Sequence, residues 1–189
     1  TDNIKLYGGF APGETDTTTR NFVLNETILS GDIGTPDVKT DNCYNVLQSG
    51  PINDAYINGL TVTRGNDIFS GAGLRNTSLS MKISHCIFSE NEAPAASGGG
   101  ILNEAPCTIY VSHCSFLSNI SLGQGGGILS ETGGRAKIDH CTFKDNKSAN
   151  GAGVHITDNT GFSSVSSCFF SGNESTNLGG ALCSHNRID

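Results

Sequence analysis

Residues 111–128, VSHCSFLSNISLGQGGGI, and residues 138–154, IDHCTFKDNKSANGAGV, follow one plan. Each stretch has an aliphatic residue, a Cys, a Phe and an Asn at fixed offsets, and then a glycine-rich turn and a second aliphatic residue. Two further copies of the first part flank them, and the four cysteines are 28, 27 and 27 residues apart. Recurrence at a fixed period of this length is typical of stacked structural repeats.

The recurring side chains form three columns, if the repeats stack in register. The expected core columns are Cys86, Cys114, Cys141 and Cys168, and Phe88, Phe116, Phe143 and Phe170. The third column consists of Asn91, Asn119, Asn146 and Asn173. Cys behaves as a small apolar residue and Phe fills wide parts of a core, so the first two columns are predicted to lie inside.

The glycines recur with the same period. Motifs of three small residues before an aliphatic residue begin at Gly71, Gly98, Gly125, Gly151 and Gly179. Glycine adopts positive φ and permits close backbone approach, so these motifs predict sharp corners. No motif is followed by the Lys-Ser/Thr of a phosphate-binding loop.

The runs between the corners are short, β-branched or aromatic, and alternate with period two, which indicates strands. A unit of about 27 residues cannot bury its apolar side alone, but stacked units can. The sequence therefore predicts an all-β fold, a right-handed single-stranded parallel β-helix of roughly six to seven coils. Residues 1–66 are expected to form irregular N-terminal coils and residues 67–189 the regular ones, with the last coil cut short.

Four strands are expected in the irregular part. They are Leu6–Phe10, Phe22–Leu29, Tyr44–Leu47 and Tyr56–Val62. Asn66 is expected to join the asparagine column, because residues 59–66 resemble the later strand-then-Asn pattern in an altered register.

The composition argues against several classes of protein. There are 25 Gly among 189 residues, and 11 Lys and Arg face 18 Asp and Glu, for a net charge of −7. With no basic cluster, nucleic acid is not an expected partner. No apolar run approaches the ~18 residues of a membrane span, so none is expected.

Neighbouring cysteines in a stacked column would be about 4.8 Å apart with parallel side chains, whereas a disulfide needs Cβ atoms about 3.8 Å apart and turned toward one another. The column is therefore expected to consist of free thiols. Cys43, Cys107 and Cys183 lie outside the column, and any disulfide would more plausibly involve them.

The asparagine column is interpreted as a structural ladder, because a side-chain amide both donates and accepts hydrogen bonds along a stack. Three ladder residues also fit the N-x-S/T glycosylation pattern, but they would be buried. Asn25 and Asn76 fit the same pattern, and they remain as credible acceptors in a eukaryotic secretory setting.

His85, His113 and His140 each precede a column cysteine, so they are expected to form an exposed polar stripe. Zinc binding by this stripe is the functional alternative. Parallel side chains about 4.8 Å apart converge poorly on one ion, and no carboxylate or thiolate shares the column. No metal and no cofactor is therefore expected.

These motifs resemble the polymorphic outer-membrane protein repeat family of bacteria, whose two motifs are GGA followed by an aliphatic residue, and FxxN. The first stands here at Gly179–Leu182, with variants at Gly98, Gly125 and Gly151, and the second at Phe88/Asn91, Phe116/Asn119, Phe143/Asn146 and Phe170/Asn173. The resemblance covers about residues 4–184. It implies a right-handed β-helix displayed outside the cell as an adhesin or stalk.

The leading functional hypothesis is a non-enzymatic, extracellular or cell-surface β-helix segment of a larger secreted protein, acting as adhesin or structural stalk. A host-cell, glycan or protein receptor is the expected partner, with head-to-tail self-association as a further possibility. Recognition is expected on loops of varying length at residues 92–97, 120–124 and 157–163.

The alternative is a carbohydrate-binding or polysaccharide-degrading β-helix, a lyase or hydrolase. Such chemistry needs paired carboxylates, or carboxylates that hold Ca²⁺ beside a basic residue. The best cluster is Lys137, Asp139, Lys144 and Asp145. The next coil carries no second acidic pair, so no catalytic residue is assigned.

Overall fold

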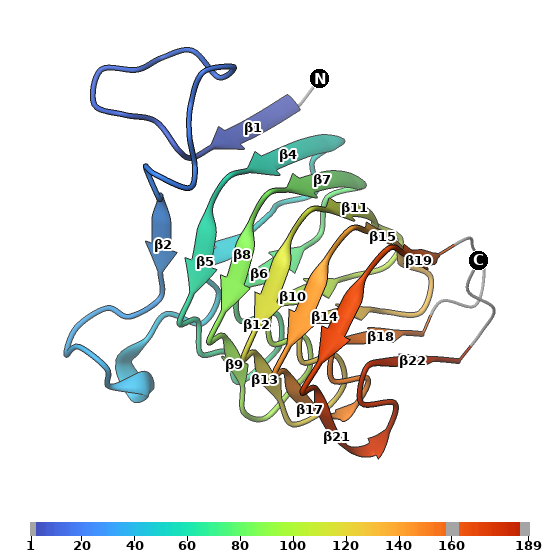
Figure 1. Ribbon diagram of the computed structural model, residues 1–189. Coiled ribbons are helices and arrows are strands. Elements are labelled where there is room, and N and C mark those ends of the chain that lie inside the picture. Colours follow the sequence, from blue (N-terminus) through green and yellow to red (C-terminus); the bar gives the residue numbers. More distant parts are fainter. Residues whose placement is uncertain (1–2, 158–162, 186–189) are drawn as a thin grey trace.

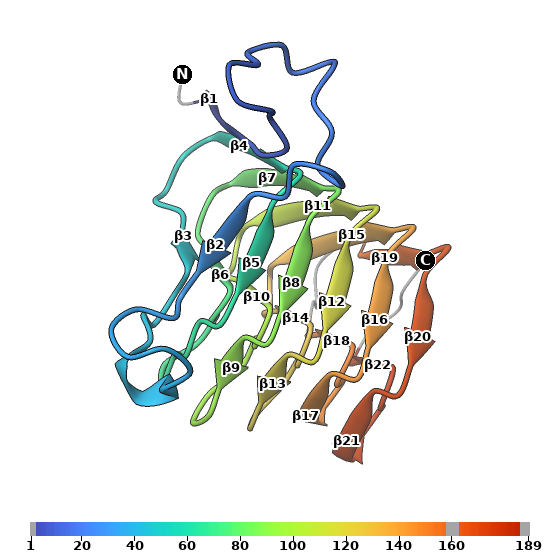
Figure 2. The ribbon, with the colours of Figure 1, turned by 60° about the vertical axis from the view of Figure 1, so that its left-hand side comes forward.

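The structure is a computed structural model that describes residues 3–157 and 163–185. Within them the chain forms twenty-two short strands and one 3₁₀ turn, η1 (Lys39–Asp41). The chain winds in coils around a common axis, and each strand pairs in parallel with its counterparts in the coils before and after it (Figures 1 and 2). The fold is a parallel β-helix, as the repeats predict.

Three faces of the β-helix are sheets of six strands, and a fourth face is a sheet of four. These counts agree roughly with the expected six to seven coils. Sheet I contains β1 (Asn3–Tyr7), β4 (Asp54–Asn58), β7 (Ser80–Ser84), β11 (Thr108–Ser112), β15 (Arg135–Asp139) and β19 (Ser164–Ser166). Sheet II contains β2 (Ile28–Ser30), β5 (Thr61–Thr63), β8 (Ile87–Ser89), β12 (Ser115–Leu117), β16 (Thr142–Lys144) and β20 (Phe169–Ser171).

The other two sheets complete each coil. Sheet III contains β3 (Leu47–Gln48), β6 (Leu74–Asn76), β10 (Ile101–Asn103), β14 (Ile128–Ser130), β18 (Val154–Ile156) and β22 (Leu182–Ser184). Sheet IV contains β9 (Glu92–Ala93), β13 (Ile120–Ser121), β17 (Lys147–Asn150) and β21 (Glu174–Leu178).

Each coil turns its corners with single residues of positive φ. The glycine motifs provide one such column, at Gly71, Gly98, Gly125, Gly151 and Gly179, with φ between 57° and 76°. A second column lies between sheets I and II, at Gly59, His85, His113, His140 and Ser167. A third lies between sheets II and IV, at Arg64, Glu90, Ser118, Asp145 and Gly172. A left-handed residue bends a strand sharply, so these columns keep the coils in register.

Side chains from sheets I, II and III fill the interior. Ile83, Val111 and Ile138 stack in sheet I, and Ile101 and Ile128 do so in sheet III, all almost completely buried. Because each of these coils places the same kind of residue at the same position within the coil, apolar side chains stack without interruption along the axis.

Several of the strands expected in the first 66 residues have other bounds in the structure. Residues 22–29 form a strand only from Ile28, because the Asn21 side chain accepts hydrogen bonds from the amides of Val23 and Leu24 and holds a turn there. The expected strand 56–62 is broken in two by the corner at Gly59, with φ of 72°. Turn chemistry at single residues decides both boundaries.

Candidate functional site

The phenylalanine column is a stack of parallel rings inside the β-helix. The ring centroids of Phe88 and Phe116 are 5.2 Å apart, those of Phe116 and Phe143 4.8 Å, and those of Phe143 and Phe170 4.9 Å. The first three rings are completely buried. The expectation that this column lies inside the fold is therefore correct for these three rings.

The cysteine column lies beside the rings, and all seven cysteines of the chain are free thiols. Cys86, Cys114 and Cys141 are buried, and Cys168 in the last coil is half-buried. The amide of Cys86 donates to Cys114 Sγ at 3.5 Å. Burial raises the pKa of the Cys114 thiol well above its ordinary value, so this group is an unreactive core residue.

The asparagine column is a hydrogen-bonded ladder. Asn91 Nδ2 donates to Asn119 Oδ1 at 3.0 Å, Asn119 Nδ2 donates to Asn146 Oδ1 at 3.0 Å, and Asn146 Nδ2 donates to Asn173 Oδ1 at 2.9 Å. Each amide nitrogen also donates to a backbone carbonyl in the preceding coil. The ladder satisfies polar groups that the corners would otherwise leave buried and unpaired.

Asn66 does not join this ladder, contrary to expectation. The amide of Gly65 donates to Asn91 Oδ1 at 3.0 Å, so Gly65 occupies the ladder position. Asn66 pairs with Glu92 one position further along, and its Nδ2 donates to the carbonyl of Lys39 at 2.6 Å. The altered register of this coil shifts the column by one residue.

A second asparagine ladder lies in sheet III. Asn76 Nδ2 donates to Asn103 Oδ1 at 2.8 Å, and Asn103 Nδ2 donates to Ser130 Oγ at 3.1 Å. The signal for it is an Asn or Ser two residues after the aliphatic residue of three glycine motifs. Asn76 is completely buried, so the expectation that it is a credible glycosylation acceptor is wrong, whereas Asn25 is half-buried.

His85, His113 and His140 lie on the outside as a stack, at corners and not within strands. Their rings are parallel, with centroids 5.1 and 5.2 Å apart. The Phe22 ring contacts His85 at 5.1 Å between centroids, but it is tilted by 46°. Partial burial and the nearby charges of His113 and Arg20 lower the pKa of His85. His140 Nδ1 contacts Asp139 Oδ2 at 2.6 Å.

A groove of about 340 Å³ adjoins this histidine stack, between the N-terminal segment and sheet II. Its lining includes Phe22, Glu26, Thr61, His85, Ile87 and Ser115. Glu26 accepts a hydrogen bond from Thr61 Oγ1 at 2.7 Å. The groove therefore combines an aromatic wall with a carboxylate and hydroxyl groups.

A second groove of about 340 Å³ is charged. Arg64 contacts Asp32 at 2.7 Å, Asp37 at 3.0 Å and Glu90 at 3.4 Å in it, which raises the pKa of the Arg64 guanidinium. These carboxylates neutralise the one arginine that lines the groove.

The four residues considered for catalysis do not form one cluster, because two of them have partners outside the set and the other two pair with each other. Asp139 also accepts a hydrogen bond from Ser166 Oγ at 2.7 Å, and this bond and His140 lower its pKa. Lys137 lies over the Tyr110 ring, with Nζ 5.7 Å from the centroid. Lys144 and Asp145 form an exposed pair at 3.9 Å.

Of the expected recognition loops, residues 92–97 begin with β9 and residues 120–124 begin with β13. Residues 158–162 of the third lie outside the described residues.

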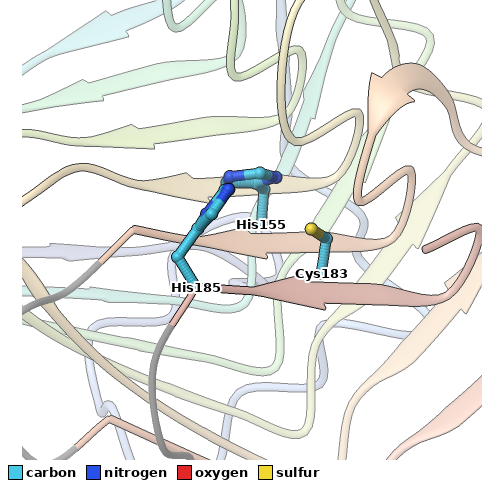
Figure 3. Close-up of side chains that lie close together, drawn as sticks. All are labelled: His155, Cys183 and His185. Atoms are coloured by element: carbon cyan, nitrogen blue, oxygen red, sulfur yellow. The ribbon is translucent and has the colours of Figure 1, made fainter. Parts of the chain in front are cut away.

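Three side chains that can bind a metal ion, none of them expected from the sequence to do so, meet at the last two coils. Ligand atoms of His155, Cys183 and His185 lie within 4.8 Å of one another. Figure 3 shows the two imidazole rings converging, with the Cys183 sulfur on the same side of the strands. His155 in β18 pairs in register with Cys183 in β22, and the amide of His185 donates to the carbonyl of Ile156 at 3.2 Å.

The sequence held one signal for this cluster, a change of residue type at one strand position of sheet III. In sheet III, Leu102 pairs with Leu129, Leu129 with His155, and His155 with Cys183. A position that holds Leu in two coils therefore holds a metal-ligating residue in the next two. His185 has no such signal, because it lies beyond the last strand.

His155 is completely buried, and neither ring nitrogen makes a hydrogen bond of ordinary geometry. Burial is the main cause that lowers its pKa to about 4, and the charge of His185 adds to it, while the nearby carbonyl of Asn150 opposes the shift. The His155 ring is therefore neutral at physiological pH, with free lone-pair capacity.

No helix among the described residues is long and apolar enough to cross a membrane. No curated protein and no solved structure matches the chain significantly. Among protein families, the right-handed β-helix region matches residues 41–188, which agrees with the parallel coils and with the predicted hand. The chain therefore belongs to the right-handed β-helix family.

Proposed function

We propose that this chain is a segment of an extracellular or cell-surface protein in which the β-helix serves as a non-enzymatic stalk and adhesive surface. The observation that carries the proposal is that the phenylalanine and asparagine columns run continuously along the axis of the β-helix. The Phe stack and the asparagine ladder run through the regular coils without a break, so most of the recurrent polar and aromatic residues stabilise a rod. The resemblance to polymorphic outer-membrane protein repeats supports the same role.

Recognition is assigned to the face that carries the histidine stack and the groove beside Phe22 and Glu26. Rigid neighbouring coils hold this face, so binding there costs little conformational entropy. Stacked rings offer flat apolar surface, and Glu26 with Thr61 offers hydrogen bonds, which suits a glycan or a peptide of a host receptor.

Adhesion of coated beads tests the proposal. Beads that carry the parent chain are expected to adhere to cultured epithelial cells or to an immobilised glycan panel under flow. A variant with Phe22→Ser, at a half-buried position, and His113→Asn, at an exposed one, removes two rings of the aromatic wall and is expected to lose most of the adhesion. Leu122→Ser, on an exposed site of another face, is the matched control. Equal adhesion by all three proteins contradicts the assignment of this face.

The polysaccharide-degrading alternative predicts a different result. Incubation with soluble polysaccharides would release reducing or unsaturated ends, and Asp139→Asn would abolish the release. That outcome would contradict the non-enzymatic stalk and favour a polysaccharide-degrading enzyme.

A further inference from the structure

We propose that His155, Cys183 and His185 form a binding site for a divalent transition-metal ion of the Zn²⁺ type, which ties the last two coils together. Two imidazoles and one thiolate are ligands that zinc favours. The inference is independent of the proposed adhesive function.

The geometry is close to what an ion requires. Bonds of about 2.0–2.3 Å in a tetrahedral arrangement place ligand atoms about 3.3–3.7 Å apart. The three ligand atoms lie within 4.8 Å of one another without an ion. Because His185 is exposed, rotation of its side chain can close the remaining distance, whereas the register of β18 and β22 already holds His155 beside Cys183.

The burial of His155 is the independent observation that points to a ligand. A completely buried ring with two nitrogens that lack hydrogen bonds is destabilising, because the ring has lost its hydrogen bonds to water without gaining others. Coordination would satisfy one nitrogen. The site also has an entry path, because Cys183 is half-buried and His185 faces solvent.

The exposed histidine stack lacks these features. Its rings are parallel and 5.1–5.2 Å apart, so their nitrogens do not converge on one point. It therefore serves as an internal comparison for the proposed site.

Binding requires loss of the Cys183 thiol proton, which passes to solvent, while both imidazoles bind in their neutral form. The three ligands leave a fourth position open for water or an external group. The ion would link the two strands through their side chains as well as through their backbone hydrogen bonds.

Metal titration of the chelator-treated, thiol-reduced chain tests the site. Zn²⁺ is expected to bind with a stoichiometry of one and to raise the melting temperature, and Co²⁺ to produce a thiolate-to-cobalt charge-transfer band. His155→Leu, Cys183→Ser and His185→Gln are each expected to weaken binding by more than the roughly 10- to 100-fold that loss of an outer-shell partner costs. His155→Leu restores the residue found in the two preceding coils, so it is expected to remain folded.

His113→Asn and Cys43→Ser are the matched controls, and both are expected to bind as the parent does. Circular dichroism verifies that each variant is folded. Three results would overturn the proposal: no Zn²⁺ binding by the parent, a cobalt complex without the thiolate band, or binding that only His113→Asn weakens.

Discussion

At the scale of single residues, Asn119 shows how a buried polar group is retained in this core. Its side chain accepts from the amide and the Nδ2 of Asn91 and donates to Asn146 Oδ1 and to the carbonyl of Phe88. It is completely buried. Removal of this side chain would leave several buried hydrogen-bonding groups without a partner, because water does not reach them.

Asn119→Ala is therefore expected to lower the free energy of unfolding by about 3 kcal/mol. Urea denaturation followed by circular dichroism measures the change. Asn25→Ala, outside both ladders, is expected to change stability by less than about 0.5 kcal/mol. Equal stability of the two variants would show that the ladder contributes nothing net.

His85 gives stability a pH dependence. Its folded pKa is lowered, so the unfolded chain takes up a proton more readily than the folded chain as the pH falls below the ordinary value of 6.5. The free energy of unfolding is therefore highest above pH 6.5, where His85 is neutral in both states, and it falls as the pH drops below that value. The charges of His113 and Arg20 add to the effect of burial on this pKa.

Denaturation midpoints at pH about 7.5 and about 5.5 check this dependence in metal-free buffer. The parent is expected to lose stability at the lower pH, and His85→Asn to lose less, because Asn tolerates the positive φ of 53° without a charge. The same loss in both proteins would assign the acid sensitivity to other groups.

At the scale of the strand, sheet II depends on the stacked rings. Phe116 lies between Phe88 and Phe143 with its ring completely buried. Phe116→Ala is expected to cost about 3–5 kcal/mol, because neighbouring coils cannot collapse into the cavity without losing register. Phe169→Ala, at a ring that is 62% exposed, is expected to cost far less. Urea denaturation compares the two, and similar losses would show that the stack is not the source of stability.

The corners between sheets IV and III depend on glycine. Gly125 has φ of 63°, and a Cβ there would lie 2.7 Å from the Leu129 amide nitrogen. Gly125→Ala is expected to lower stability by at least about 1–2 kcal/mol. Gly50→Ala meets nothing within 4 Å and is expected to be neutral or slightly stabilising. Thermal unfolding distinguishes them, and equal midpoints would exclude a strained corner.

At the scale of the whole molecule, the last coil presents apolar side chains on β20 and β21. Phe169 is 62% exposed and Leu178 is 56% exposed. Among the described residues β20 pairs only with β16, which leaves backbone donors and acceptors on its other edge for a further strand. We therefore expect head-to-tail association between copies of this chain.

Sedimentation velocity over a range of concentrations tests that association. The parent is expected to form larger species as concentration rises, and Phe169→Lys with Leu178→Lys to weaken them by about tenfold or more. Leu122→Lys alters another exposed leucine, on a middle coil, and is the matched control. A monomeric parent at every concentration would contradict self-association.

The repeats alone were enough to predict the parallel β-helix. A period of about 27 residues places equivalent residues at the same position of every coil, so that they stack along the axis. The tertiary structure decided where the period fails. The shift at Gly65 became visible only in its hydrogen bond to Asn91, the first residue of the ladder. The turn held by Asn21 and the hydrogen bond of buried Asn76 to Asn103 involve residues that the repeat pattern does not mark. The cluster of His155, Cys183 and His185 likewise needed the tertiary structure, because register across coils brings together side chains far apart in the chain, and local sequence does not encode that distance.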